Sequence, residues 1–175
     1  MLAAREAALL LLLVTAAFTD LAYGKVYNWL TMPAIVLGLG LSYAAWGIVP
    51  GFEGPLDNIL GCAFGGGLFL IFFAKGWIGP GDAKLVAAIG ALKGLTFVVY
   101  SIFLAACVGA VMAVGWFIWQ GRFWDGLAGS LLLLVSPKRF KKRYTGPPTM
   151  MPYGLAISAG GLWAWVYLNR SLLFG

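Results

Sequence analysis

Apolar residues in this chain come in long runs, separated by short groups of polar, glycine and proline residues. A helix needs about 20 mainly apolar residues to cross the hydrocarbon core of a bilayer, and several runs approach that length. A single segment in lipid must satisfy its own backbone hydrogen bonds, which favours helices. The pattern therefore predicts an all-α, polytopic membrane helix bundle of about six transmembrane helices. The expected helices cover residues 2–19, 29–49, 58–74, 82–92, 95–119 and 153–168.

The breaks between the runs carry helix-ending and turn signals. Gly24 is expected to end the first helix, and Gly79-Pro80-Gly81 forms a turn before the fourth. The fourth run is too short for a perpendicular span unless it extends through Lys93 and Gly94. Residues 120–149 form the longest stretch without a span. Its apolar part, residues 126–135, is expected to lie on the membrane surface or to re-enter partway.

Composition supports an integral membrane protein with a single domain over residues 1–175. The chain is 62% hydrophobic and only 10% charged, whereas soluble proteins have about 25% charged residues. It contains no histidine, which excludes a Ser-His-Asp triad, a Cys-His dyad and zinc sites that depend on histidine. Cys62 and Cys107 lie inside apolar runs, and we expect them to be small buried residues rather than a disulfide or a metal pair.

The net charge of +6 comes mainly from one basic cluster in residues 138–143. Such a cluster beside a membrane indicates topology and contact with anionic lipid headgroups, and not a nucleic-acid site. Positive residues favour the cytoplasmic side. Placing the N-terminus outside puts this cluster, Lys25, Lys75, Lys84 and Arg122 in the cytoplasm. The same orientation places Asp20 and Asp82 together at the cytoplasmic face.

These two aspartates are the main functional candidates. Asp20 closes the first apolar run and Asp82 opens the fourth, and an acidic group against the bilayer is costly enough to suggest a function. Two neighbouring carboxyls share one proton, so one can activate water while the other protonates a carbonyl. The helix dipole favours charge on Asp82 at a helix start and disfavours it on Asp20 at a helix end. This predicts Asp82 as the base and Asp20 as the acid.

Other interpretations remain open for the same residues. Asp82 can be a helix N-cap and Asp20 a solvated interfacial group. Lys84 can extend its ammonium to the interface, bind an acidic substrate group or stabilise an ionised Asp82. The whole chain can also be a small transporter whose aspartates carry protons or cations, or a non-catalytic subunit of a pilus or secretion machine.

Three motifs resemble one family. Gly79-Pro80-Gly81-Asp82-Ala83-Lys84-Leu85 resembles the GxGDxKL signature of type IV prepilin peptidases, which are membrane aspartyl proteases. The stretch from Asp20 through Val26 and Asn28 to Thr31 resembles the family's other aspartate motif. Pro152-Tyr153-Gly154 resembles its late Pro-aromatic-Gly motif. Presenilin-like proteases share GxGD but are less similar, because Thr19 precedes Asp20 and the late motif here is Pro-Tyr-Gly.

The resemblance implies cleavage of the N-terminal leader of prepilins or pseudopilins at the cytoplasmic face of the bacterial inner membrane. It implies that Asp20 and Asp82 are catalytic, that Gly79 and Gly81 shape the loop, and that Pro152, Tyr153 and Gly154 pack or position the substrate. The chain lacks paired C-x-x-C motifs, so it resembles the short branch of Tad/Flp pilus systems. No N-methyltransferase activity, metal or other cofactor is therefore expected. The expected partners are the substrate and membrane lipids.

Overall fold

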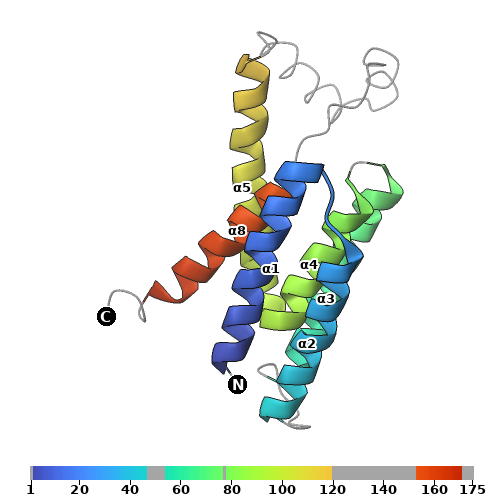
Figure 1. Ribbon diagram of the computed structural model, residues 1–175, viewed down its shortest axis with the longest axis vertical. Coiled ribbons are helices and arrows are strands. Elements are labelled where there is room, and N and C mark those ends of the chain that lie inside the picture. The colour runs from blue at the N-terminus through green and yellow to red at the C-terminus, as the bar shows by residue number, and fades with distance from the viewer. Residues whose placement is uncertain (1, 47–53, 77, 120–152, 171–175) are drawn as a thin grey trace. The chain divides into compact units, whose positions relative to one another are not determined.

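The computed structural model describes residues 2–46, 54–76, 78–119 and 153–170 (Figure 1). Within these ranges the chain forms six α-helices and no strand, which confirms the all-α prediction. The helices are α1 (Leu2–Tyr23), α2 (Asn28–Trp46), α3 (Pro55–Ala74), α4 (Pro80–Lys93), α5 (Leu95–Trp119) and α8 (Tyr153–Leu168). Pro152 and the predictions for residues 120–149, including the basic cluster at 138–143, lie outside the described residues.

Two helices begin earlier than the apolar pattern predicts. α3 begins at Pro55, and α4 begins at Pro80 with Gly79 as its N-cap. Proline suits the first helical position because its fixed φ is helical and its missing N–H would have no partner there. Asp82 is therefore not the N-cap but lies inside the first turn of α4, where its carboxylate accepts a hydrogen bond from the Gly79 N–H. Gly24, at φ 62°, follows the end of α1, as predicted.

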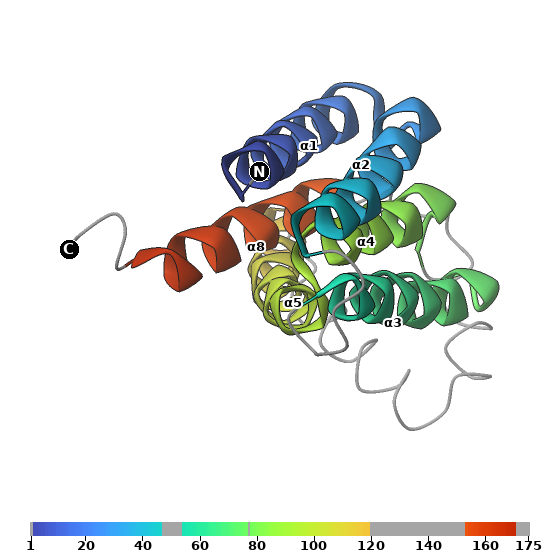
Figure 2. The same ribbon diagram turned by 90° about the horizontal axis from the view of Figure 1, so that it is seen from below.

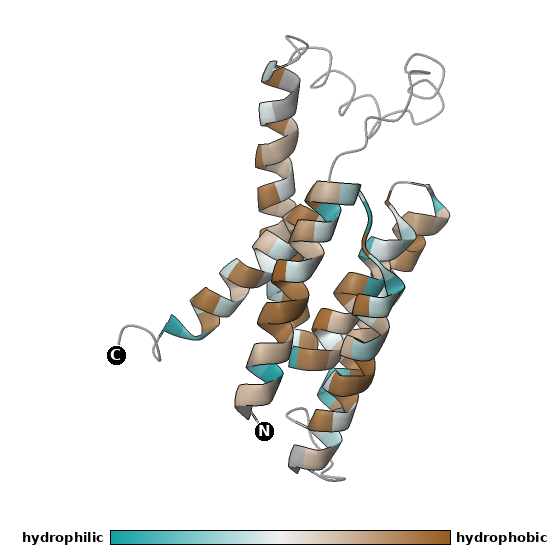
Figure 3. Cartoon of the chain, in the orientation of Figure 1, coloured by the Kyte–Doolittle hydropathy of each residue, from teal (hydrophilic) through white to brown (hydrophobic). Residues whose placement is uncertain are grey.

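Three of the described helices are long and apolar enough to cross a membrane: Ala3–Tyr23, Pro55–Ala74 and Leu95–Gly115. Large apolar side chains point outward along these and other helices, such as Leu11, Val36 and Phe103 at 68%, 70% and 66% exposure. Figure 3 shows that apolar residues cover much of each helix. Such an exterior is typical of a protein whose outer surface contacts lipid.

The chain divides into two compact units, Met1–Gly109 with Pro152–Gly175, and Ala110–Met151. In the second unit the structure describes only residues 110–119, the last turns of α5. In the first unit α4 is the central helix, because it contacts α1, α2, α3 and α8 (Figure 2). All residues from 85 to 92 are buried.

Glycines allow α2 and α3 to approach α4 closely. A Cβ atom on Gly38 of α2 would lie 2.7 Å from the carbonyl carbon of Ala91, and one on Gly61 of α3 would lie 2.5 Å from the carbonyl carbon of Gly94. Any larger residue would push these backbones apart. Close backbone approach through small residues is the usual way in which helices pack within a bilayer.

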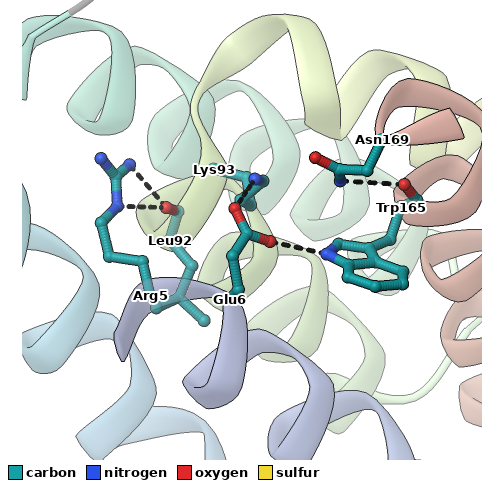
Figure 4. Close-up of polar contacts among 6 residues, drawn as sticks. All are labelled: Arg5, Glu6, Leu92, Lys93, Trp165 and Asn169. Atoms are coloured by element: carbon teal, nitrogen blue, oxygen red, sulfur yellow. Dashed lines mark hydrogen bonds and ion pairs between the residues drawn. The ribbon is translucent and has the colours of Figure 1, made fainter. Parts of the chain in front are cut away.

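A polar cluster joins the start of α1 to the end of α4 (Figure 4). The buried Arg5 guanidinium donates two hydrogen bonds to the carbonyl oxygen of Leu92, at 2.7 and 3.0 Å. Glu6 forms an ion pair with Lys93 and accepts a hydrogen bond from the indole N–H of Trp165 on α8. We call this set the Arg5 cluster. It ties three helices together at the end of α4 that is opposite Asp82.

The prediction that both cysteines are buried was wrong. Cys107 is exposed on α5 and Cys62 is half-buried on α3, and both are free thiols. Their apolar surroundings in the sequence are the outward faces of helices, since a membrane protein carries apolar residues outside as well as inside.

Candidate active site

Asp20 and Asp82 lie at the same end of the bundle. Asp20 belongs to the last turn of α1, and Asp82 belongs to the first turn of α4. Both are buried, with 6% and 8% of their surfaces exposed. The two carboxyls are near enough that the charge of Asp20 acts on the ionisation of Asp82. A buried pair of this kind shares a proton, because two adjacent negative charges in a poorly solvated site are costly.

Three effects set the pKa of Asp82, which lies outside the three long apolar helices. Burial, and then the charge of Asp20, raise the pKa of Asp82 from its ordinary value of 3.8 to about 6. The backbone N–H of Gly79 opposes this rise by donating a 3.2 Å hydrogen bond to Asp82 Oδ2. Asp82 therefore retains its proton well above the pH at which a solvated aspartate ionises.

The first turn of α8 lies against Asp20. The backbone N–H of Leu155 donates a 2.8 Å hydrogen bond to Asp20 Oδ2, across 135 positions of sequence. A Cβ atom on Gly154 would lie 2.8 Å from Asp20 Cγ, so only glycine leaves room for the carboxyl there. Two of the three late motif residues are described: Gly154 lies against Asp20, and Tyr153 is exposed at 44%.

Val26, in the connection between α1 and α2, lies against both α4 and α8. A Cβ atom on Gly81 would lie 2.8 Å from the Val26 carbonyl oxygen, and one on Gly154 would lie 2.9 Å from Val26 Cγ2. Val26 belongs to the Asp20 motif, but its apolar side chain carries no chemical signal in the sequence. Its contacts show that it separates the helix starts that carry Asp82 and the Leu155 N–H.

The two predicted loop glycines differ in their surroundings. Gly81 is packed tightly against Val26, whereas a Cβ atom on Gly79 would meet only Asp82 Oδ2, at an ordinary 3.4 Å. Gly79 has φ −75° and ψ 155°, a conformation open to any residue. What Gly79 supplies to the site is thus its backbone N–H.

Lys84 connects α4 to the start of α2. Its ammonium donates a 2.8 Å hydrogen bond to Asn28 Oδ1. The motif that contains Asp82 is therefore in direct contact with the motif that contains Asp20. Binding of a substrate group by Lys84 stays a prediction. Among the described residues, no group of three or more histidine, cysteine, aspartate or glutamate side chains gathers that could hold a metal ion.

Comparison with known families adds to this geometry. The family model for the type IV leader peptidase family matches residues 7–114, well over half of the chain, and the match includes both aspartates. The chain belongs to the type IV leader peptidase family. This confirms the resemblance inferred from the motifs. No curated protein and no solved structure matches the chain.

Membership of this family identifies the chain as a peptidase of the leader peptidase type. The match ends at residue 114, so α8 lies beyond it. The contact of this leader peptidase's Leu155 with Asp20 is therefore known from the tertiary structure alone.

Proposed function

We propose that this protein is a membrane aspartyl endopeptidase that removes the N-terminal leader from prepilins or pseudopilins at the cytoplasmic membrane face. The observation that carries the proposal is the buried pair Asp20 and Asp82, close enough that the charge of Asp20 raises the pKa of Asp82, in a chain of the type IV leader peptidase family. Two carboxyls that share one proton provide the acid and the base that amide hydrolysis needs.

The reaction uses the pair in its singly protonated state. The ionised carboxylate takes a proton from water as the water oxygen forms a bond to the scissile carbonyl carbon. The protonated carboxyl gives its proton to the carbonyl oxygen, which produces a neutral tetrahedral intermediate. When the C–N bond breaks, the proton collected from water passes to the leaving nitrogen. The carboxylate that acted as the acid takes a proton back from a hydroxyl of the intermediate, which becomes the new carboxyl group. Both carboxyls return to their starting states, and no further cofactor enters.

The distribution of charge supports an orientation with the aspartates in the cytoplasm. Lys25, Lys75 and Lys84 lie in or next to the connections at the aspartate end. At the opposite end, Arg5 and Lys93 are accompanied by Glu6 and Asp57, so little net positive charge remains there. Because positive residues stay on the cytoplasmic side, this balance favours a site that opens to the cytoplasm of a bacterial inner membrane.

The substrate class follows from the position of the site. Peptide bonds inside a helix are shielded by their own hydrogen bonds, so an extended segment just before an apolar helix is easier to cleave. Such a segment would reach the aspartates while its apolar helix stays in lipid. A short leader followed by a hydrophobic helix, as in prepilins of the Tad/Flp type, has this design.

The test is leader removal from a prepilin that is co-expressed with this chain in membranes. Wild type should release the leader, and Asp20→Asn and Asp82→Asn should each reduce the rate by at least about 100-fold. Asp57→Asn is the matched control. Asp57 accepts a hydrogen bond from the Leu95 N–H at the opposite end of the bundle, and an asparagine oxygen preserves that contact.

The other functional classes predict different results. A non-catalytic assembly subunit would leave leader removal unchanged in both aspartate variants. A transporter would show proton or cation flux that depends on Asp20 and Asp82, with no leader removal. Either result would overturn the proposed hydrolysis.

A further inference from the structure

The backbone contacts that α8 makes with Asp20 differ from those that α4 makes with Asp82. Asp20 Oδ2 accepts the Leu155 N–H at 2.8 Å, and the N–H of Gly154 acts on the same carboxylate. Asp82 accepts one longer bond, 3.2 Å, from the Gly79 N–H of its own helix cap. The hydrogen bond to Asp20 is therefore shorter than the one to Asp82, and it comes from a different helix.

The N–H groups at the start of α8 are available for an anion. Leu155 is the third residue of α8, and the first N–H groups of a helix have no acceptor within that helix. The positive end of the helix dipole also favours a negative group at this position. Hydrogen bonds from backbone N–H groups stabilise a carboxylate more than a neutral carboxyl. Burial disfavours a charge on Asp20, and all three effects act against that cost.

The surrounding charges leave this asymmetry in place. On α4, the negative charge of Asp20 raises the pKa of Asp82, so the two carboxyls are not both ionised at low cost. Lys84 is directed to Asn28. The remaining described titratable side chains at this end are exposed: Tyr23, Lys25, Tyr27, Lys75 and Tyr153.

We propose that the N-terminus of α8 is a positioning element that holds Asp20 as the ionised partner, which makes Asp20 the general base and Asp82 the acid. The proposal rests on the proposed function. It reverses the assignment expected from the dipoles of α1 and α4, because that expectation did not include α8. In the resulting step, Asp20 takes the proton of the attacking water and Asp82 gives its proton to the carbonyl oxygen.

The test removes single backbone N–H groups without changing side chains. Replacing Leu155 by its α-hydroxy acid substitutes an ester oxygen for the N–H, and replacing Gly79 by glycolic acid does the same opposite Asp82. Each full-length chain is made by cell-free translation into vesicles with a co-reconstituted prepilin. The measured quantity is kcat/KM for leader removal as a function of pH, which reports the ionisations of the free enzyme.

The two replacements should move opposite limbs of the pH profile. The acidic limb records protonation of the base, so the Leu155 ester should move it to higher pH by about one unit. The alkaline limb records loss of the proton from the acid, so the Gly79 ester should move that limb upward. In each case the other limb should stay in place.

The opposite pattern, in which the Leu155 ester moves the alkaline limb, would make Asp20 the acid and overturn the proposal. Profiles that do not change in either ester would also overturn it, since the N–H groups would then not act on the reacting pair. An ester at Ile157, deeper in α8, controls for general loss of helix stability and should lower activity at all pH values without moving either limb. Failure of the proposed function is recognised separately, because wild type would then not remove the leader, or Asp20→Asn and Asp82→Asn would both remove it at the wild-type rate.

Discussion

Gly81 of α4 lies directly against the backbone of Val26. A Cβ atom at position 81 would be 2.8 Å from the Val26 carbonyl oxygen and 3.1 Å from its Cβ. This contact fixes how the α1–α2 connection passes the first turn of α4, next to Asp82. This tight contact also distinguishes Gly81 from Gly79, which has no comparably close neighbour.

Gly81→Ala should therefore be much more harmful than Gly79→Ala. The added methyl at 81 must displace Val26 or α4, and overpacking of this kind typically costs about 1–3 kcal/mol of stability. A shift of the Asp82 turn should lower leader removal by about tenfold or more. Gly79→Ala keeps the N–H and has room, so its rate should stay within about threefold of wild type. Equal losses in the two variants, measured at matched expression, would contradict this account.

Asp82→Asn should abolish leader removal and yet stabilise the fold at neutral pH. The pKa of Asp82 is raised to about 6 in the folded protein, so ionisation of this group opposes folding. The cost is absent below pH 3.8, grows between pH 3.8 and 6, and is complete above that. A neutral asparagine avoids it, which predicts a gain of about 2–3 kcal/mol in the free energy of unfolding at pH 7.

The pH dependence provides the control for this second prediction. At about pH 4 the wild type is largely protonated at position 82, so the stability difference between it and Asp82→Asn should nearly disappear. Unfolding in mixed micelles at both pH values measures the difference. A variant that is less stable than wild type at pH 7 would indicate that the carboxylate serves mainly as a helix cap.

Arg5→Ala should destabilise the bundle from the end opposite the aspartates. The change leaves the Leu92 carbonyl at the end of α4 without its two charged donors, and such bonds contribute about 1.5–3 kcal/mol each when they are lost from a buried site. Arg170→Ala is the matched control. Arg170 is exposed and only lies over the ring of Tyr167, so its removal should cost less than about 1 kcal/mol. Similar unfolding free energies for both variants would rule out a structural role for the Arg5 cluster.

Leader removal should also depend on bilayer thickness. α4 has 14 residues, which span only about 21 Å at 1.5 Å per residue, whereas the hydrocarbon core is about 30 Å thick. Polar groups are buried at both of its ends, Asp82 at one and the Arg5 cluster at the other. A thin bilayer reduces this mismatch. Activity in vesicles of short-chain phospholipid should exceed that in long-chain phospholipid severalfold, and an equal or opposite dependence would contradict this prediction.

Much of this leader peptidase could be predicted from local pattern. The apolar runs gave six helices within a few residues of their observed bounds, because a segment in lipid has few alternatives to a helix. The order of Asp20, Asp82 and the glycine turn gave the candidate site. Errors occurred where a few residues decide a boundary, as at Pro55 and Pro80, whose preference for the first helical position extends each helix beyond its apolar run.

The sequence by itself therefore determined the helices, the membrane class and the two acidic groups, since each depends on residues that are close together in the chain. Only the tertiary structure decided which backbone groups surround those acids. The N–H of Leu155 lies 135 positions from Asp20, and Arg5 lies 87 positions from Leu92. Backbone N–H and C=O groups occur at nearly every residue, so no side-chain pattern marks the ones that meet a carboxylate. Their positions follow from helix packing, which is why the acid and base roles expected from the sequence did not include the effect of α8.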